Sequence, residues 1–197
     1  MDEQILVCMQ TELPDVLGSE GFVPAGDDLL LALLRASVFM RRGDAEGNPL
    51  WRQIIPYIVL LQNGRAFAVE RLNTQSEARL HGRLSVGIGG HLNEADIALG
   101  ALRELHEELC LDDATQGGLV FRGFINDYST AVSRDHLGCL YTVEASGRVF
   151  VRESDKMAGL FRSSAFLQAN RARLENWSAI ALDYLLNQGL VPRESED

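Results

Sequence analysis

Residues 87–111 constrain the fold of this chain more than any other segment does. They open with the glycine-rich run Gly-Ile-Gly-Gly and continue into a stretch of helical periodicity. Successive residues of a helix are rotated by about 100°, so Glu104, Glu107 and Glu108 share an arc of roughly 100°. The segment therefore predicts a glycine turn that leads into a helix with three carboxylates on one side.

The same helix has an apolar side. With Glu104 as the origin, five apolar residues fall between about 100° and 220°, which predicts that the side opposite the carboxylates is buried: Ala98, Leu99, Leu102, Leu105 and Leu109. Gly100 lies within the carboxylate arc, where a glycine costs a helix about 1 kcal/mol relative to alanine. Two explanations are open: it leaves room for a metal, water or substrate, or it lets a neighbouring loop pack closely.

The residue types on this helix suit divalent metal ions. Carboxylate oxygens are the ligands that Mg²⁺ and Mn²⁺ prefer, and carboxylates this close repel one another unless a cation lies among them. The formal net charge is −10, and an acidic surface repels a polynucleotide. We therefore expect no nucleic-acid polymer as a partner, and a small phosphate substrate only together with cations.

The segment resembles the Nudix box, whose pattern is G-x5-E-x7-R-E-U-x-E-E-x-G-U, with U an aliphatic residue. Residues 103–111 read R-E-L-H-E-E-L-C-L and match its second half at every specified place but one. Gly89 or Gly90 supplies the opening glycine. Over about residues 39–145 the chain is similar to a MutT-like subgroup of predicted phosphoesterases, on the segments 53–57, 77–82, 87–91 and 136–138.

Two places depart from the box. The sixth place after Gly90 is Asp96 rather than glutamate, and only six residues then separate it from Arg103, so the turn is one residue short. Asp96 is the expected substitute for the glutamate. Cys110 stands where the box has a glycine that caps the helix in the left-handed conformation. We expect this cysteine either to destabilise the left-handed cap by about 1 kcal/mol relative to glycine or to end the helix in a different conformation.

The resemblance implies an α+β fold, a Nudix-type α/β/α sandwich with a mixed β-sheet and a catalytic loop-helix motif. It implies that Glu107 and Glu108 bind Mg²⁺ or Mn²⁺ most directly and that Glu104 completes the cluster. A main-chain carbonyl of Gly89 or Gly90 would be a further ligand.

The resemblance also implies roles and an activity. Arg103 lies one turn before Glu107 and would orient it as an ion pair, and these two form the expected catalytic set together with Glu104. The implied activity is metal-dependent hydrolysis of the phosphoanhydride bond of a nucleoside diphosphate linked to another moiety. Candidates for the general base outside the helix are Asp127, Asp135 and Glu144.

Two other functions remain as alternatives. One is a catalytically weak Nudix-fold module that binds or senses a nucleotide-like ligand. The other is an isoprenoid-diphosphate isomerase on the related fold. The intact set of three glutamates favours the hydrolase, because a pure binding module does not need to retain all of them.

Cationic residues alternate in the sequence just before the glycine turn: Arg79, His81 and Arg83. In an extended segment alternate side chains point to the same side, which predicts a cationic face that binds substrate phosphates. The alternative is a solvated strand face of ordinary charged residues. The spacing of the three histidines at 91, 106 and 136 matches no common zinc site.

The remaining sequence predicts a single Nudix domain over residues 1–197, with an N-terminal extension (1–48) packed on a core (49–190). The polar segment 41–49 is the expected boundary between the two. Strands are expected at residues 4–9, 57–61, 66–71, 119–125 and 137–143, with a type I′ turn at Asn63–Gly64. Helices are expected from Asp27 or Asp28 toward Ser37, well buried, and near the C-terminus, with a core stripe of Leu174, Trp177, Ile180, Ala181 and Tyr184.

Compartment and association follow from composition. No stretch approaches the roughly 18 apolar residues of a membrane span, and the first residues lack the features of a signal peptide. The three cysteines form no metal-type cluster and no paired framework, which is typical of reduced thiols. We therefore expect a cytoplasmic protein with no membrane partner. The oligomeric state is open, with a homodimer among the options.

Overall fold

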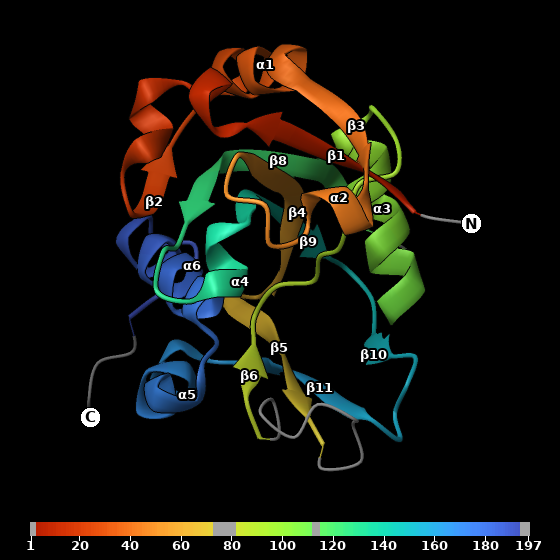
Figure 1. Cartoon of the computed structure of the whole chain (residues 1–197). Helices are drawn as coiled ribbons and strands as arrows, with labels where there is room; N and C mark the ends of the chain where they lie inside the picture. The colour runs from red at the N-terminus through yellow and green to blue at the C-terminus, as the bar shows by residue number, and fades with distance from the viewer. Residues whose placement is uncertain (1–2, 73–81, 112–114, 194–197) are drawn as a thin grey trace. The chain divides into compact units, whose positions relative to one another are not determined.

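The computed structural model describes residues 3–72, 82–111 and 115–193, and Figure 1 follows the chain through them. The chain divides into two units. Unit 1 comprises Met1–Tyr57, Gly89–Glu104 and Val120–Tyr141, and unit 2 comprises Ile58–Ile88, Leu105–Leu119 and Thr142–Asp197. Four elements contribute residues to both units: strands β4 (Trp51–Gln62), β8 (Thr115–Asn126) and β9 (His136–Ala145), and helix α3 (Ile97–Glu108).

The other elements are short. The remaining strands are β1 (Gln4–Met9), β2 (Gly21–Pro24), β3 (Ser37–Arg41), β5 (Arg65–Arg71), β6 (Leu84–Ser85), β7 (Leu109–Leu111), β10 (Val149–Val151) and β11 (Met157–Arg162). The remaining α-helices are α1 (Asp27–Ala36), α2 (Arg42–Ala45), α4 (Ala131–Arg134), α5 (Ser164–Ala169) and α6 (Asn176–Asn187). In the described part of the chain, no helix has the length and apolar character that crossing a membrane requires.

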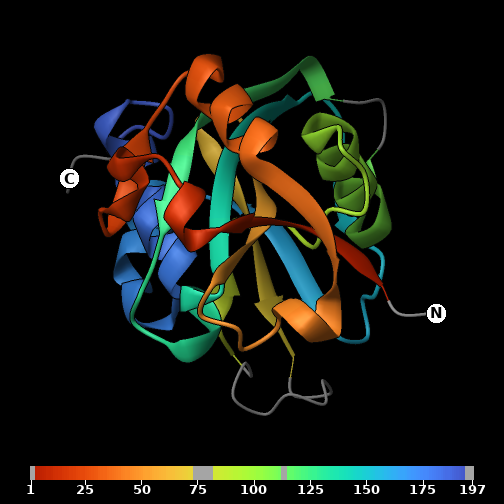
Figure 2. The same ribbon diagram turned by 45° about the horizontal axis from the view of Figure 1, so that its top comes forward.

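Unit 1 is built around β1, which is antiparallel to both β3 and β4. Figure 2 shows α1 leading directly into β3. The side chains of Ile5 and Val7 on β1 pack with Ala45 of α2, and all three are fully buried. The polar segment 41–49, expected as a boundary, thus contains a short helix that contributes to this core. The single-domain organisation expected from the sequence stays a prediction.

The fold is of the expected α+β class, and its sheet is mixed. Strands β4 and β9 are neighbours. The Gln53 N–H donates to the Asp135 carbonyl (2.7 Å) next to the start of β9, and the Gln62 amide donates to the Ala145 carbonyl (3.2 Å) at its end. Contacts in the same order along both strands mean that β4 and β9 run parallel. Strand β2 is antiparallel to β8, and β11 is antiparallel to β5.

Strand β4 is longer than the sequence indicated. It begins at Trp51, whereas a start after Pro56 was expected, because proline is rare inside paired strands. The Ile58 N–H donates to the Ile88 carbonyl at 2.8 Å, and the nitrogen of Pro56, two residues earlier, points to the same side. Proline is tolerated at this position because its nitrogen faces the glycine turn and not a paired strand, so the sheet loses no hydrogen bond.

The β4–β5 hairpin has the expected turn. Asn63 has φ 51° and Gly64 has φ 71°, as a type I′ turn requires.

Helix α1 differs from expectation in both of its predicted features. Its N-cap is Gly26 rather than Asp27 or Asp28, and only Leu30 and Leu33 are buried, with Leu31 49% exposed.

The C-terminal helix α6 also differs from expectation, because its buried side is rotated relative to the predicted stripe. Of that stripe, Leu174, just before the helix, and Ala181 are buried, whereas Trp177, Ile180 and Tyr184 are only partly buried. The buried residues of the helix are Ser178, Ala181, Leu182, Leu185 and Leu186.

Gly123 of β8 offers a test of the β2–β8 pairing. Its φ is 142°, and a Cβ atom there would lie less than 3.0 Å from the Val23 carbonyl oxygen. We expect Gly123→Ala to lower the free energy of unfolding by about 2 kcal/mol, measured by urea denaturation. Gly18→Ala is the control, since nothing lies within 4 Å of the added carbon; equal effects of the two changes would contradict the packing described.

Candidate functional site

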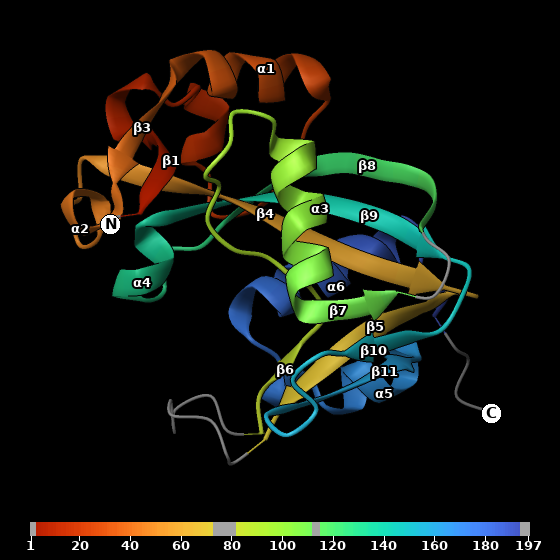
Figure 3. The ribbon, with the colours of Figure 1, turned by 90° about the vertical axis from the view of Figure 1, so that its right-hand side faces the viewer.

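Helix α3 is entered through a loop that Figure 3 shows running up to its first turn. Asp96 precedes the helix, and its Oδ1 accepts hydrogen bonds from the N–H groups of Ala98 (3.0 Å) and Leu99 (3.1 Å). These are the N–H groups that have no partner inside a helix. Asp96 is therefore the cap of the helix that carries the glutamates.

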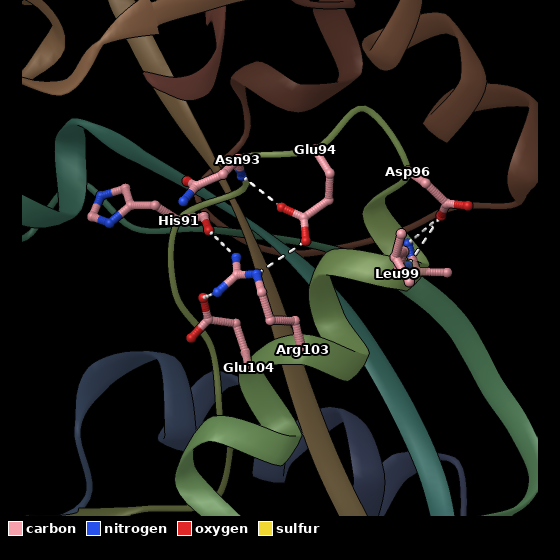
Figure 4. A network of polar contacts seen from close by, with 8 residues as sticks. His91, Asn93, Glu94, Asp96, Leu99, Arg103 and Glu104 are labelled. Atoms are coloured by element: carbon pink, nitrogen blue, oxygen red, sulfur yellow. Dashed lines mark hydrogen bonds and ion pairs between the residues drawn. The ribbon is translucent and has the colours of Figure 1, made fainter. Parts of the chain in front are cut away.

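Arg103 joins the loop to the helix, as Figure 4 shows. Its Nε donates to Glu94 Oε1 (3.0 Å), one terminal nitrogen donates to Glu104 Oε1 (2.8 Å), and the other donates to the His91 carbonyl (2.8 Å). One guanidinium thus fixes two carboxylates and the main chain of the turn. All of these residues belong to unit 1.

Glu94, not Asp96, is the acidic partner of Arg103 in the loop. The sequence indicated Asp96 as the substitute for the glutamate of the box, because the count was started from Gly90. Glu94 precedes Arg103 by nine residues, whereas the box places its glutamate eight before the arginine, so the loop between them is one residue longer than the pattern. A search that allowed one extra residue before Arg103 would have found Glu94.

Glu104 is only 8% exposed. A Cβ atom on Gly90 would lie less than 3.0 Å from its carboxylate oxygens, so the carboxylate lies directly against the turn. Gly90 therefore provides a space that any side chain would fill. A cluster of glutamates on a helix is ordinarily a solvated face, and the burial of Glu104 excludes that explanation for this residue.

The buried side of α3 is rotated from its predicted position. Besides Glu104, its buried residues include Ile97, Ala101 and Leu105, whereas Leu99 is 58% exposed. With Glu104 as the origin these residues fall between about 0° and 100°, overlapping the carboxylate arc. The prediction of a carboxylate side opposite the buried side was wrong. It assumed that every charged residue faces water, whereas Glu104 is buried with its charge paired to Arg103.

The structure decides between the two explanations for Gly100. A Cβ atom there would lie less than 3.0 Å from a methyl group of Leu92, which is fully buried. The Leu92 carbonyl in turn accepts a hydrogen bond from the Leu6 N–H of β1 (2.8 Å). Gly100 therefore lets the loop pack closely on the helix.

The neighbouring residues complete the turn and the end of the helix. A Cβ atom on Gly89 would lie less than 3.0 Å from the Pro56 carbonyl oxygen, so this position also requires glycine.

Helix α3 ends at Glu108 and the chain continues directly into β7, where Cys110 pairs with Phe150. Cys110 does not have positive φ. The helix thus ends differently from the box, which is one of the two expected outcomes.

The predicted phosphate-binding residues are only partly described. Arg79 and His81 lie outside the described residues. Arg83, in unit 2, donates from its guanidinium to the carbonyls of Ala172 (3.2 Å) and Leu174 (2.7 Å), and β6 begins only after it. These bonds already engage Arg83 with the main chain. Its role in phosphate binding stays a prediction.

The general-base candidates differ in environment. Asp127 is 3% exposed and accepts from the Ser129 N–H (2.9 Å). Asp135 accepts from the Gly47 N–H (2.9 Å), and Glu144 is exposed. Asp127 and Asp135 therefore each have a main-chain contact that holds a loop.

Two histidines far apart in the sequence lie together in unit 1. The His91 and His136 ring centroids are 5.8 Å apart, and His91 Nε2 is 2.8 Å from Gln53 Oε1. Burial lowers the pKa of His91 to about 4 and also lowers the pKa of His136, so both imidazoles are neutral at pH 7. Sequence reasoning missed this cluster, because no local pattern links residues 53, 91 and 136.

The donor chemistry of the site fits a divalent cation. Its side chains are carboxylates, and the space over Gly90 is occupied by the Glu104 carboxylate. Glu107 is exposed and Glu108 is partly buried, both on the last turn of α3. Within the described ranges, no three His, Cys, Asp or Glu side chains are gathered closely enough to form a metal cluster.

Comparison with known proteins identifies the family. YmaB of Bacillus subtilis (strain 168) is 34% identical over 205 residues, which cover 94% of this chain and 98% of YmaB. The crystal structure of Tm1382, a protein assigned provisionally as a Nudix hydrolase, is 31% identical, with a TM-score of 0.81 over 94% of this chain and 100% of that one. This chain belongs to the Nudix superfamily.

The Nudix fold is shared more widely. A bifunctional NMN adenylyltransferase/ADP-ribose pyrophosphatase from Francisella tularensis, in complex with AMP and a manganese ion, has a TM-score of 0.51 at 14% identity. The match covers 70% of this chain and 42% of that one, and at this identity it shows the fold alone. No family model matches the chain.

The roles of Glu94 and Asp96 can be separated by stability. We expect Asp96→Ala to lower the free energy of unfolding by about 1 kcal/mol through loss of the helix cap, and Asp96→Asn to have less effect, since its amide oxygen still accepts. We expect Glu94→Gln to lower the free energy of unfolding by roughly 1 kcal/mol, because it removes the ion pair with Arg103. The loss is modest because that ion pair is partly exposed to solvent. Urea denaturation measures all three; a larger loss for Asp96→Asn than for Glu94→Gln would show that the assignment is reversed.

Proposed function

We propose that this chain is a metal-dependent hydrolase that cleaves the phosphoanhydride bond of a nucleoside diphosphate linked to another moiety. The proposal depends chiefly on one observation, the buried Glu104 carboxylate that Arg103 holds against Gly90. Membership of the Nudix superfamily supports it.

The charges around Arg103 favour a bound cation. Its guanidinium carries one positive charge, and it is bonded to two carboxylates, those of Glu94 and Glu104. Burying a carboxylate without full compensation is unfavourable. Carboxylates gathered beside the turn in this way provide oxygen ligands that a divalent cation prefers, and such a cation would stabilise them.

Glu104, Glu107 and Glu108 would hold Mg²⁺ or Mn²⁺, with a main-chain carbonyl of Gly89 or Gly90 as a further ligand. When bound, such an ion stabilises charge on phosphoryl oxygens and lowers the pKa of a bound water. Arg103 acts by positioning, because its bonds to Glu94, Glu104 and the His91 carbonyl keep Glu104 and the turn in a fixed arrangement. Preorganisation of this kind removes the need for the site to rearrange during the reaction.

The proposed partner is a small nucleotide-like diphosphate and not a nucleic-acid polymer. A net charge of −10 opposes binding of a long polyanion, whereas a short diphosphate can bind where cations screen its charge. Arg79, His81 and Arg83 remain the proposed contacts for the phosphates.

The metal site is tested by charge-neutral variants. We expect Glu107→Gln and Glu108→Gln each to reduce kcat by about a thousandfold with Mg²⁺, because loss of metal stabilisation raises the barrier by several kcal/mol. The measurement is the rate at which a substrate that the native protein cleaves is converted into its two phosphorylated products, followed by phosphorus NMR. Glu153→Gln is the matched control, since Glu153 is exposed and paired with Lys156. Near-normal kcat in both helix variants would refute the assignment.

A separate measurement distinguishes the hydrolase from the nucleotide-binding module. The full chain is incubated with Mg²⁺ or Mn²⁺ and a panel of nucleoside di- and triphosphates, dinucleotides and nucleotide sugars, and phosphorus NMR follows each compound for hours. The hydrolase converts at least one of them into products with new phosphomonoester signals. Compounds that bind tightly by calorimetry but stay intact across the panel would establish the binding module instead.

A further inference from the structure

We propose that Gln53, His91 and His136 form a subsite that hydrogen-bonds the hydroxyl groups of a sugar or similar polyol in the substrate. The assignment to the substrate depends on the proposed function, because the subsite adjoins the turn at Gly89 and Gly90. The hydroxyl groups could come from the nucleoside ribose or from the attached moiety, and the chemistry recognised is the same.

The three side chains are brought together by the backbone of unit 1. Gln53 lies on β4, and its N–H donates to the Asp135 carbonyl (2.7 Å), which places it beside His136 at the start of β9. The His91 carbonyl points to Arg103, and Figure 4 shows its ring directed away from that network. The ring is therefore free of the Arg103 network and bonds to Gln53 instead.

Each of the three side chains has a hydrogen-bonding atom to spare. Gln53 is 2% exposed, and its Nε2 has no acceptor among the described residues. His91 donates from Nε2 to Gln53 Oε1, which leaves its Nδ1 as an acceptor. His136 donates from Nδ1 to the Val132 carbonyl (2.6 Å), which leaves its Nε2 as an acceptor. The protonated nitrogens are assigned from these bonds.

A buried donor without an acceptor destabilises the free protein. The Gln53 amide is therefore an observation that points to a ligand, and it is independent of the histidine pair. A ligand that supplies an acceptor to Gln53 and donors to the two imidazoles would satisfy all three atoms.

Hydroxyl groups meet this requirement, whereas ionised phosphate groups and a stacked base do not. A hydroxyl both donates and accepts, so neighbouring hydroxyls can serve one donor and two acceptors. Ionised phosphate oxygens only accept and could not bond to the imidazole lone pairs. A base stacked between the rings would need them about 7 Å apart, whereas they are 5.8 Å apart and tilted by 51°.

Arg52 keeps His136 in place from the other side of β4. Its guanidinium donates to the His136 carbonyl and to Asn126 Oδ1 (2.6 Å), and the residue is 1% exposed. Arg52 and Gln53 are adjacent on the strand, so their side chains point to opposite faces. The subsite is thus supported by a buried network that is itself outside it.

The experiment measures binding of non-cleavable probes to the full chain by NMR, with the histidine side chains labelled with ¹⁵N. One pair of probes is AMP and 2′,3′-dideoxy-AMP, which tests the nucleoside ribose. The other pair is ribose 5-phosphate and pentyl phosphate, which tests an attached sugar. We expect the hydroxylated member of at least one pair to bind about tenfold more tightly and to shift the resonances of His91 Nδ1 and His136 Nε2.

Variants connect the preference to these residues. Gln53→Leu and His136→Phe should each bring the affinity ratio close to one, while His106→Phe, at an exposed histidine on α3, should leave it unchanged. Gln53→Glu serves if the leucine variant does not fold, because it has the same shape and removes the donor. Equal affinities within both pairs for the native protein, or an unchanged ratio in the variants, would overturn the proposal.

The probes have no phosphoanhydride bond, so their binding does not depend on turnover. A preference for hydroxylated probes in a protein that cleaves nothing on the panel would refute the hydrolase and leave the polyol subsite standing. Cleavage of a compound on the panel without a preference for the hydroxylated probes would refute the polyol subsite and leave the hydrolase standing.

Discussion

The arrangement of the site depends on the Arg103 guanidinium. It bonds to Glu94 in the loop, to Glu104 on the helix and to the His91 carbonyl between them. A planar group with several fixed donors can hold three acceptors at set angles, which a lysine could not do. The position of Glu104 against Gly90 and the direction of the His91 ring away from Arg103 are both consistent with these bonds.

Burial and charge are balanced on the same helix. Helix α3 buries Ile97, Ala101 and Leu105, and the same side carries Glu104. The apolar residues supply the packing energy that holds the helix in place, and Arg103 offsets part of the penalty for burying a carboxylate. Glu104 on the inner side of the helix is shielded from water, where its ion pair with Arg103 is stronger than it would be on an exposed face.

The sequence predicted the elements better than the contacts. Local patterns were sufficient for β1 and for the turn at Asn63, because alternation and turn chemistry act over a few residues. The residue that takes the place of the box glutamate and the buried side of α3 were predicted wrongly, because loop length and the pairing of a buried charge are decided by tertiary packing. The cluster of Gln53, His91 and His136 depends on which strands are neighbours, and no local pattern could indicate it.

The bond between the Leu6 N–H and the Leu92 carbonyl ties the loop that positions Glu104 to a buried strand that is paired on both sides. Any motion that separates the loop from β1 must break this bond and expose the Leu6 amide to solvent. Hydrogen exchange at that one amide therefore reports how often the loop leaves β1, and with it how long the arrangement around Glu104 persists.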